Sequence, residues 1–122
     1  MTDVTEGFEY HNGVWTARCH TSKGLKLKVR VIGDTGFMKS PSAPIQLQTL
    51  MDSLDVHVDK ATAFACNSEY RDDISLAGGI GVDSVVVTQW DDIKVWFTLR
   101  DSDRMVGVRI NKDKAVDVFC DS

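Results

Sequence analysis

Paired carboxylates are the commonest arrangement in this sequence that could do acid–base chemistry or attract a cationic partner. They occur as Asp72-Asp73, as Asp91-Asp92, and as Asp101 with Asp103. Each set falls in a predicted turn or loop, where Asp is frequent because its side chain accepts hydrogen bonds from nearby backbone amides. We therefore interpret most of them as solvated turn residues. The functional alternative is an acidic rim that accelerates the approach of a basic partner.

Cysteine and histidine side chains could bind a metal ion or form a nucleophile–base pair, but their spacing favours neither. No CxxC, HxxxH or HExxH motif occurs, and Cys19 and His20 point to opposite faces of a predicted strand. His57 and Cys66 are separated along a predicted helix by about 13 Å, which is too far for one ion. No GxSxG motif occurs either. We expect no metal, no cofactor and no catalytic residues.

A basic stripe lies on two adjacent predicted strands and consists of Arg18, Lys26, Lys28 and Arg30, with Arg18 opposite Lys26. No aromatic residue is interleaved with this stripe, so unpaired bases have no surface on which to stack. Lysines also keep exposed sheets from pairing with other chains, and we favour this interpretation. A nucleic-acid partner is therefore not expected. An RNA-binding accessory domain that uses the stripe is kept as an alternative.

The clearest candidate contact surface lies on the polar side of the last four predicted strands. When buried faces are matched across the strands, Trp96 falls opposite Arg109 and Val86. Interface hot spots are enriched in Trp, Tyr and Arg. The alternatives are a local Trp–Arg stack without a partner, or a face that another part of the chain covers. The predicted partner-binding residues are Trp96, Arg109, Asp117, Phe119, Trp90, Asp91, Asp92, Asp101 and Asp103.

Alternating apolar residues predict the strands that position these side chains. Three strands are expected before residue 33, with Asn12-Gly13 as a type I′ turn between the first two, and four strands between Asp83 and Ser122. Helical spacing predicts one helical stretch over residues 45–70, which could break at the poor helix formers 55–58. Residues 71–82 are expected to be a flexible connection.

The element order predicts an α+β fold in a single domain, residues 1–122. It consists of an antiparallel sheet of about six to seven strands (β-β-β-α-β-β-β-β) packed on one helical layer. The formal net charge is −4, which argues against a dedicated nucleic-acid binder. No apolar run is long enough to span a membrane, and the first residues lack a signal peptide. The three cysteines are expected to be reduced thiols, so we expect a cytoplasmic protein without a membrane partner.

The chain as a whole resembles a known class of small bacterial proteins. The resemblance rests on the segments Glu69-Tyr70-Arg71-Asp72, Ser84-Val85-Val86-Val87, Ile93–Leu99, Met105–Ile110 and Ala115–Phe119, together with the acidic charge and element order. The class comprises the immunity proteins of polymorphic-toxin and contact-dependent growth-inhibition systems. The resemblance implies a non-enzymatic protein that neutralises a cognate toxin domain, in some systems a nuclease, and we expect that domain to be basic. A small enzyme whose site the sequence hides is the other alternative.

Overall fold

The computed structural model describes residues 7–20, 24–33, 41–101 and 103–121. These residues form a seven-stranded sheet in which the strands lie side by side in sequence order. The strands are β1 (Glu9–His11), β2 (Val14–His20), β3 (Lys26–Ile32), β4 (Ile80–Gln89), β5 (Asp92–Leu99), β6 (Met105–Asn111) and β7 (Lys114–Asp121). Between β3 and β4 the described residues form α2 (Ala43–Asp52), α3 (Leu54–Cys66) and α4 (Arg71–Leu76). The predicted α+β class is confirmed.

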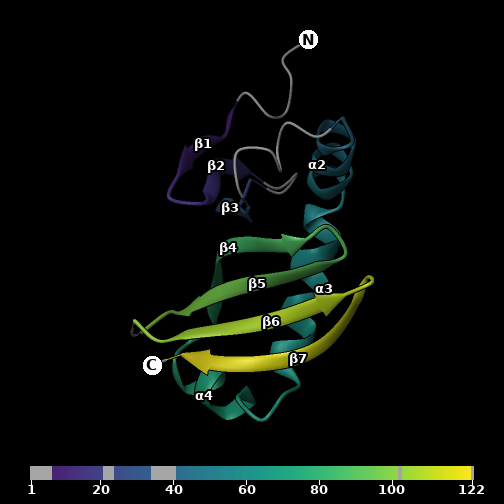
Figure 1. Cartoon of the computed structure of the whole chain (residues 1–122). Coiled ribbons are helices and arrows are strands. Elements are labelled where there is room, and N and C mark those ends of the chain that lie inside the picture. Colours follow the sequence, from purple (N-terminus) through teal and green to yellow (C-terminus); the bar gives the residue numbers. More distant parts are fainter. Residues whose placement is uncertain (1–6, 21–23, 34–40, 102, 122) are drawn as a thin grey trace.

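The sheet is mixed, which corrects the expected antiparallel arrangement. β3 and β4 pair in parallel, whereas all other neighbouring strands are antiparallel. A parallel pair requires a long crossover connection, and the helical segment between β3 and β4 supplies it. Figure 1 shows α3 crossing behind β4–β7, and the sheet face toward the viewer is free of the described helices.

The helical layer is divided into three helices in the described residues, where one stretch was expected. The break lies at Ser53, before the predicted weak patch at 55–58, which is helical. The backbone N–H of Ser53 donates to both Thr49 and Leu50, so α2 ends there, and the Ser53 carbonyl accepts from His57 in the first turn of α3. The hydrogen bonds are thereby kept across the break.

Residues 71–82 are ordered elements, so the predicted flexible connection is wrong. They contain α4, a two-glycine helix end and the start of β4. Gly78 has φ +82°, its N–H donates to Ser75, and the N–H of Gly79 donates to Ile74. This pair of bonds is a Schellman motif, which ends a helix with a residue in the left-handed region that glycine adopts without strain.

The hydrophobic core lies between the helices and one face of the sheet. The strands contribute alternate residues, because successive side chains of a strand point to opposite faces. The largest fully buried side chains are Phe97, Leu47, Leu54, Leu99 and Ile110, followed by Val29, Val31, Val85, Val87, Val95, Val106 and Val108. The alternation that was read from the sequence therefore identifies the buried face correctly for β3, β5 and β6. Val116, which alternates with Val118 and Cys120 in the sequence and was expected to point inward, is 51% exposed because the register irregularity of β7 leaves it without a partner in β6.

Candidate functional site

The sheet face opposite the helices, here called the open face, carries the side chains that were predicted to bind a partner. Figure 1 shows that no described helix crosses this face at β4–β7, and Arg18, Lys26 and Arg30 are exposed on the same side of β2 and β3. Two transverse rows of this face, both set by the register, contain the candidate residues. One row, the Trp96 row, is Arg18, Lys28, Ser84, Trp96, Gly107 and Phe119, and the other, the Arg109 row, is Thr16, Arg30, Val86, Lys94, Arg109 and Asp117.

Trp96 was expected in one row with Arg109 and Val86, and the structure places it in a different row from these two residues. Trp96 lies opposite Gly107 and Ser84, and it does not lie opposite Arg109 and Val86 as expected. The predicted pairing of Arg109 with Asp117 is confirmed. The error is a shift of two residues, and such a shift leaves every side chain on its face. Hydrophobic alternation detects only shifts by one residue, so it could not reveal this error.

The contact between Trp96 and Gly107 selects the observed register. A Cβ atom at position 107 would lie 2.7 Å from the Trp96 ring, so only glycine fits beneath the indole. Across this bare position Trp96 reaches Phe119, with ring centroids 6.4 Å apart and planes at 34°. The Nζ of Lys94 lies 5.5 Å from the centre of the Phe119 ring. We call Trp96, Phe119 and Lys94 the aromatic cluster.

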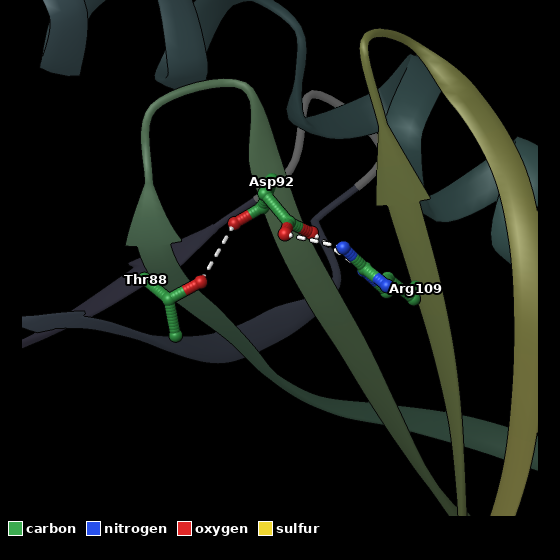
Figure 2. Close-up of polar contacts among 3 residues, drawn as sticks. All are labelled: Thr88, Asp92 and Arg109. Atoms are coloured by element: carbon green, nitrogen blue, oxygen red, sulfur yellow. Dashed lines mark hydrogen bonds and ion pairs between the residues drawn. The ribbon is translucent and has the colours of Figure 1, made fainter.

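Arg109 is held by a carboxylate of the neighbouring strand (Figure 2). Its Nε and one terminal nitrogen donate to the two carboxylate oxygens of Asp92, at 2.9 and 2.8 Å. Such two-point pairs fix the planar guanidinium in one orientation. Hydrogen bonds from Arg109 hold the pKa of the Asp92 carboxyl below its ordinary value. The Thr88 hydroxyl donates to the backbone carbonyl of Asp92 at 3.2 Å. Side chains of both neighbouring strands, β4 and β6, therefore bind the start of β5.

Asp92 thus lies in β5 and binds Arg109, which differs from its expected position in a solvated acidic rim. Asp117 is exposed, and its carboxylate accepts a hydrogen bond from the Val118 N–H at 2.9 Å. Asp91, Asp101 and Asp103 are exposed in the hairpin connections at the two ends of β5. These three carboxylates are the part of the predicted rim that faces solvent.

Trp90 lies apart from the other predicted contact residues. Its side chain is half-buried and packs against the core beneath the helices. Together with Asp91 it lines a cavity of about 210 Å³ that also contains Ser53 and His57. The structure therefore brings Trp96, Phe119, Arg109 and Asp117 to one face, and it places Trp90 on the other.

His57 is buried, although the histidines were expected from the sequence to be ordinary surface residues. It is 8% exposed, its Nδ1 has no hydrogen-bond partner among the residues that the structure describes, and burial lowers the pKa of the imidazole. The signal was present in the sequence, because His57 follows Leu54 by three residues and precedes Ala61 by four. That spacing places it on the apolar face of the helix.

The basic stripe also lies on the open face, although its pairing differs from the prediction. Arg18 is opposite Lys28, and Lys26 is opposite His20. The surface around the stripe is hollowed into cavities of about 420 Å³ and 490 Å³, both lined by Arg18 and Lys28. No ion pair or side-chain hydrogen bond joins these four cations to the part of the chain that the structure describes.

The described residues contain no group of three or more His, Cys, Asp or Glu side chains that could hold a metal ion. Cys19, Cys66 and Cys120 are free and half-buried, and burial raises the pKa of the Cys19 thiol, which makes it a weaker nucleophile at neutral pH. None of the described helices has the length and apolar character required to cross a bilayer. Comparisons with protein-family models, with curated proteins and with solved structures find no match to this chain.

Proposed function

We propose that this chain is a non-enzymatic binding protein that contacts a protein partner through the aromatic cluster on its open face. The observation that carries the proposal is the meeting of Trp96 and Phe119 above Gly107, on a face that no described helix covers. A partly exposed Trp that meets Phe119, with Lys94 over the Phe119 ring and Arg109 in the next row of the same face, has the composition of an interface hot spot. Both rings are already held in place, so binding would order few side chains.

The more specific proposal is an immunity protein that neutralises a bacterial toxin domain. It is supported by the resemblance in element order, acidic charge and C-terminal meander. The exposed carboxylates of Asp91, Asp101 and Asp103 stand at both ends of β5, whose centre is Trp96. In this proposal they attract a basic toxin surface and speed its approach, while the aromatic cluster slows its release.

A growth-rescue experiment tests this proposal. The proposal predicts an adjoining upstream gene for a large secreted protein, and the C-terminal domain that this gene encodes is expressed with and without this chain. Rescue of growth by the wild-type chain, and its loss with Trp96→Ala, is the expected result. In binding measurements on the purified pair, the same substitution should weaken affinity by about 30-fold or more, as for a true hot spot.

Leu76→Ala is the matched control, because Leu76 is 84% exposed on α4 and lies away from the open face. It should leave rescue and affinity unchanged. Equal rescue by a folded Trp96→Ala protein would remove the aromatic cluster as the contact surface. A partner that binds but is not a toxin would retain the binding function and reject the immunity role.

A further inference from the structure

We propose that the basic half of the open face binds single-stranded nucleic acid. The phosphates would lie on Arg18, Lys28 and Arg30, and a base would stack on Trp96. This function goes beyond the protein-binding role proposed above, because its charged residues lie on β2 and β3 rather than in the aromatic cluster. It revises the expectation from sequence that a nucleic-acid partner is absent.

The first argument is the arrangement of the cations. Lys26, Lys28 and Arg30 alternate along β3 and face the same side, so the Cα atoms of neighbouring stripe residues lie about 6.6–6.8 Å apart. Arg18 stands opposite Lys28 on β2. Like charges placed opposite each other destabilise a sheet, and a bound polyanion would remove that repulsion. A line of positive charge suits a linear chain of phosphates.

Protection of a sheet edge does not account for this stripe. β3 is an interior strand, which pairs with β2 along its whole length and with β4 at Lys28–Val31. Several cations elsewhere in the described residues are engaged by oxygen atoms of the chain. Arg109 binds Asp92, Arg104 approaches Asp73 at 3.8 Å, and Lys60 donates to the carbonyl of Asp113. The stripe residues have no such partner among the described residues.

The second argument is the shape of the surface. The two cavities beside Arg18 and Lys28 have volumes of about 420 and 490 Å³, so the cations rim hollows in the face. Lys26 lines the first hollow and Arg30 the second. Asp83 also lines the first and Glu9 the second, so each hollow contains one carboxylate that would repel phosphate.

The third argument is that the fold brings an aromatic residue near the basic stripe, although no aromatic residue is interleaved with the stripe in the sequence. Register places Lys28 beside Ser84, and Ser84 beside Trp96, in the same row. The Cα atoms of Lys28 and Trp96 are therefore two strands apart, at roughly 9–10 Å, and the Trp96 ring extends from there over Gly107 of β6. Ser84 itself is small, and its exposure of 3% shows that neighbouring groups cover it. Open sheets that present aromatic rings bind unpaired bases by stacking, which favours single strands over duplexes.

The test is fluorescence anisotropy with labelled single-stranded RNA and DNA oligonucleotides and the matching duplex, at low and moderate salt. We expect binding to either single strand, weaker binding to the duplex, and affinity that falls with salt. RNA and DNA share the proposed chemistry, and their ratio tells which one the surface prefers. Absence of binding to both single strands at low salt would overturn the proposal.

Charge variants locate the site. The double substitution Arg18→Gln with Lys28→Gln should lower affinity at least tenfold and reduce the salt slope by about 1.4, since each phosphate contact on a single strand contributes about 0.7. Asp83→Asn should strengthen binding. The control is Lys112→Gln with Lys114→Gln, which removes equal charge from the exposed β6–β7 hairpin. An equal loss in the control would show nonspecific attraction and reject the site.

Trp96→Leu tests stacking, because leucine still covers Gly107 but has no aromatic face. It should lower affinity by about tenfold without changing the salt slope. Unfolding curves confirm that each variant is folded, and the Gln pair is expected to fold because it removes repulsion. Polyglutamate that competes as well as the oligonucleotide would assign the surface to an acidic protein and overturn the proposal. The stripe variants leave the aromatic cluster intact, so they separate this function from the protein-binding one.

Discussion

The indole ring of Trp96 occupies the space above Gly107 where any other residue would place its Cβ atom. The ring carbons lie 2.7–2.9 Å from that position. Glycine in a strand interior is usually unfavourable because it loses more conformational freedom on folding than alanine. Here it is required by the close approach of the ring, which also brings Trp96 to Phe119.

Gly107→Ala is expected to destabilise the protein by about 1–3 kcal/mol, because the Trp96 ring must move and loses its contact with Phe119. Urea unfolding followed by tryptophan fluorescence measures the change. Gly81→Ala in β4 is the control, since nothing lies within 4 Å of its Cβ position, and it should be neutral or slightly stabilising. Equal stability of Gly107→Ala and Gly81→Ala would contradict the close contact.

The pair of Asp92 and Arg109 predicts a stability change in acid. The folded-state pKa of Asp92 is lowered, mainly by hydrogen bonds from Arg109, so its contribution is present above its unfolded pKa of about 3.9. The contribution is lost as the pH falls through the folded pKa. Asp92→Asn should therefore be less stable than the wild type at pH 6, and the difference should shrink toward pH 2. Unfolding free energies across this range measure it.

Asp117→Asn is the control for that series, because Arg109 binds Asp92 and leaves the Asp117 carboxylate to the Val118 N–H. Asp117→Asn should lose unfolding free energy in acid as the wild type does. If Asp117→Asn removed that loss and Asp92→Asn kept it, the assignment of the ion pair would be wrong.

His57 predicts a second pH effect, nearer neutrality. Burial lowers its folded-state pKa, so its contribution to stability is present above the unfolded pKa of about 6.5. The contribution is lost as the pH falls below 6.5 toward the folded pKa, because the unfolded chain takes up the proton first. His57→Gln should flatten this decline, as measured by thermal unfolding between pH 7.5 and 5. The control His20→Gln, at an exposed histidine, should retain the decline in stability. If His57→Gln showed the same decline with falling pH as the wild type, the assignment of the effect to His57 would be wrong.

Gly78→Ala is expected to destabilise the protein by about 1–2 kcal/mol, because Gly78 has φ +82° and a Cβ is strained in that region. Space is not the limit, since nothing lies within 4 Å of its Cβ position. Gly78→Asn should cost less, because asparagine tolerates the left-handed region better. Denaturant midpoints compare the two, and equal losses would mean that the helix end does not require this conformation.

Alternation in the sequence was sufficient to find the strands and their buried faces, because a strand has a strict period of two. It could not determine which residues stand opposite each other, because the pairings of Trp96 with Gly107 and with Arg109 bury the same side chains. Gly107, a glycine in the interior of a strand, was the feature of the sequence that could have indicated the observed pairing with Trp96. Alternation also could not reveal the parallel pairing of β3 and β4, because that pairing depends on where a long helical segment returns to the sheet.

The candidate site was predicted in part for the same reason. Trp96, Phe119, Arg109 and Asp117 share the open face as expected, since face follows from alternation. The partner of Arg109 was missed, because Asp92 was assigned to a turn. The proximity of Trp96 to the basic stripe was also missed, because it arises only when β3 and β4 pair.

The parallel seam between β3 and β4 has a consequence for the order of folding. β1–β3 and β4–β7 are each joined by short connections, whereas the seam closes over the segment from residue 33 to residue 79. Contacts that close long loops form late, because the entropy of closure must be met before they stabilise the chain. The basic strands and the aromatic strands become one surface only at this last step. A folding intermediate with either half alone would therefore lack the composite surface, and the proposed binding of single strands would then report complete folding.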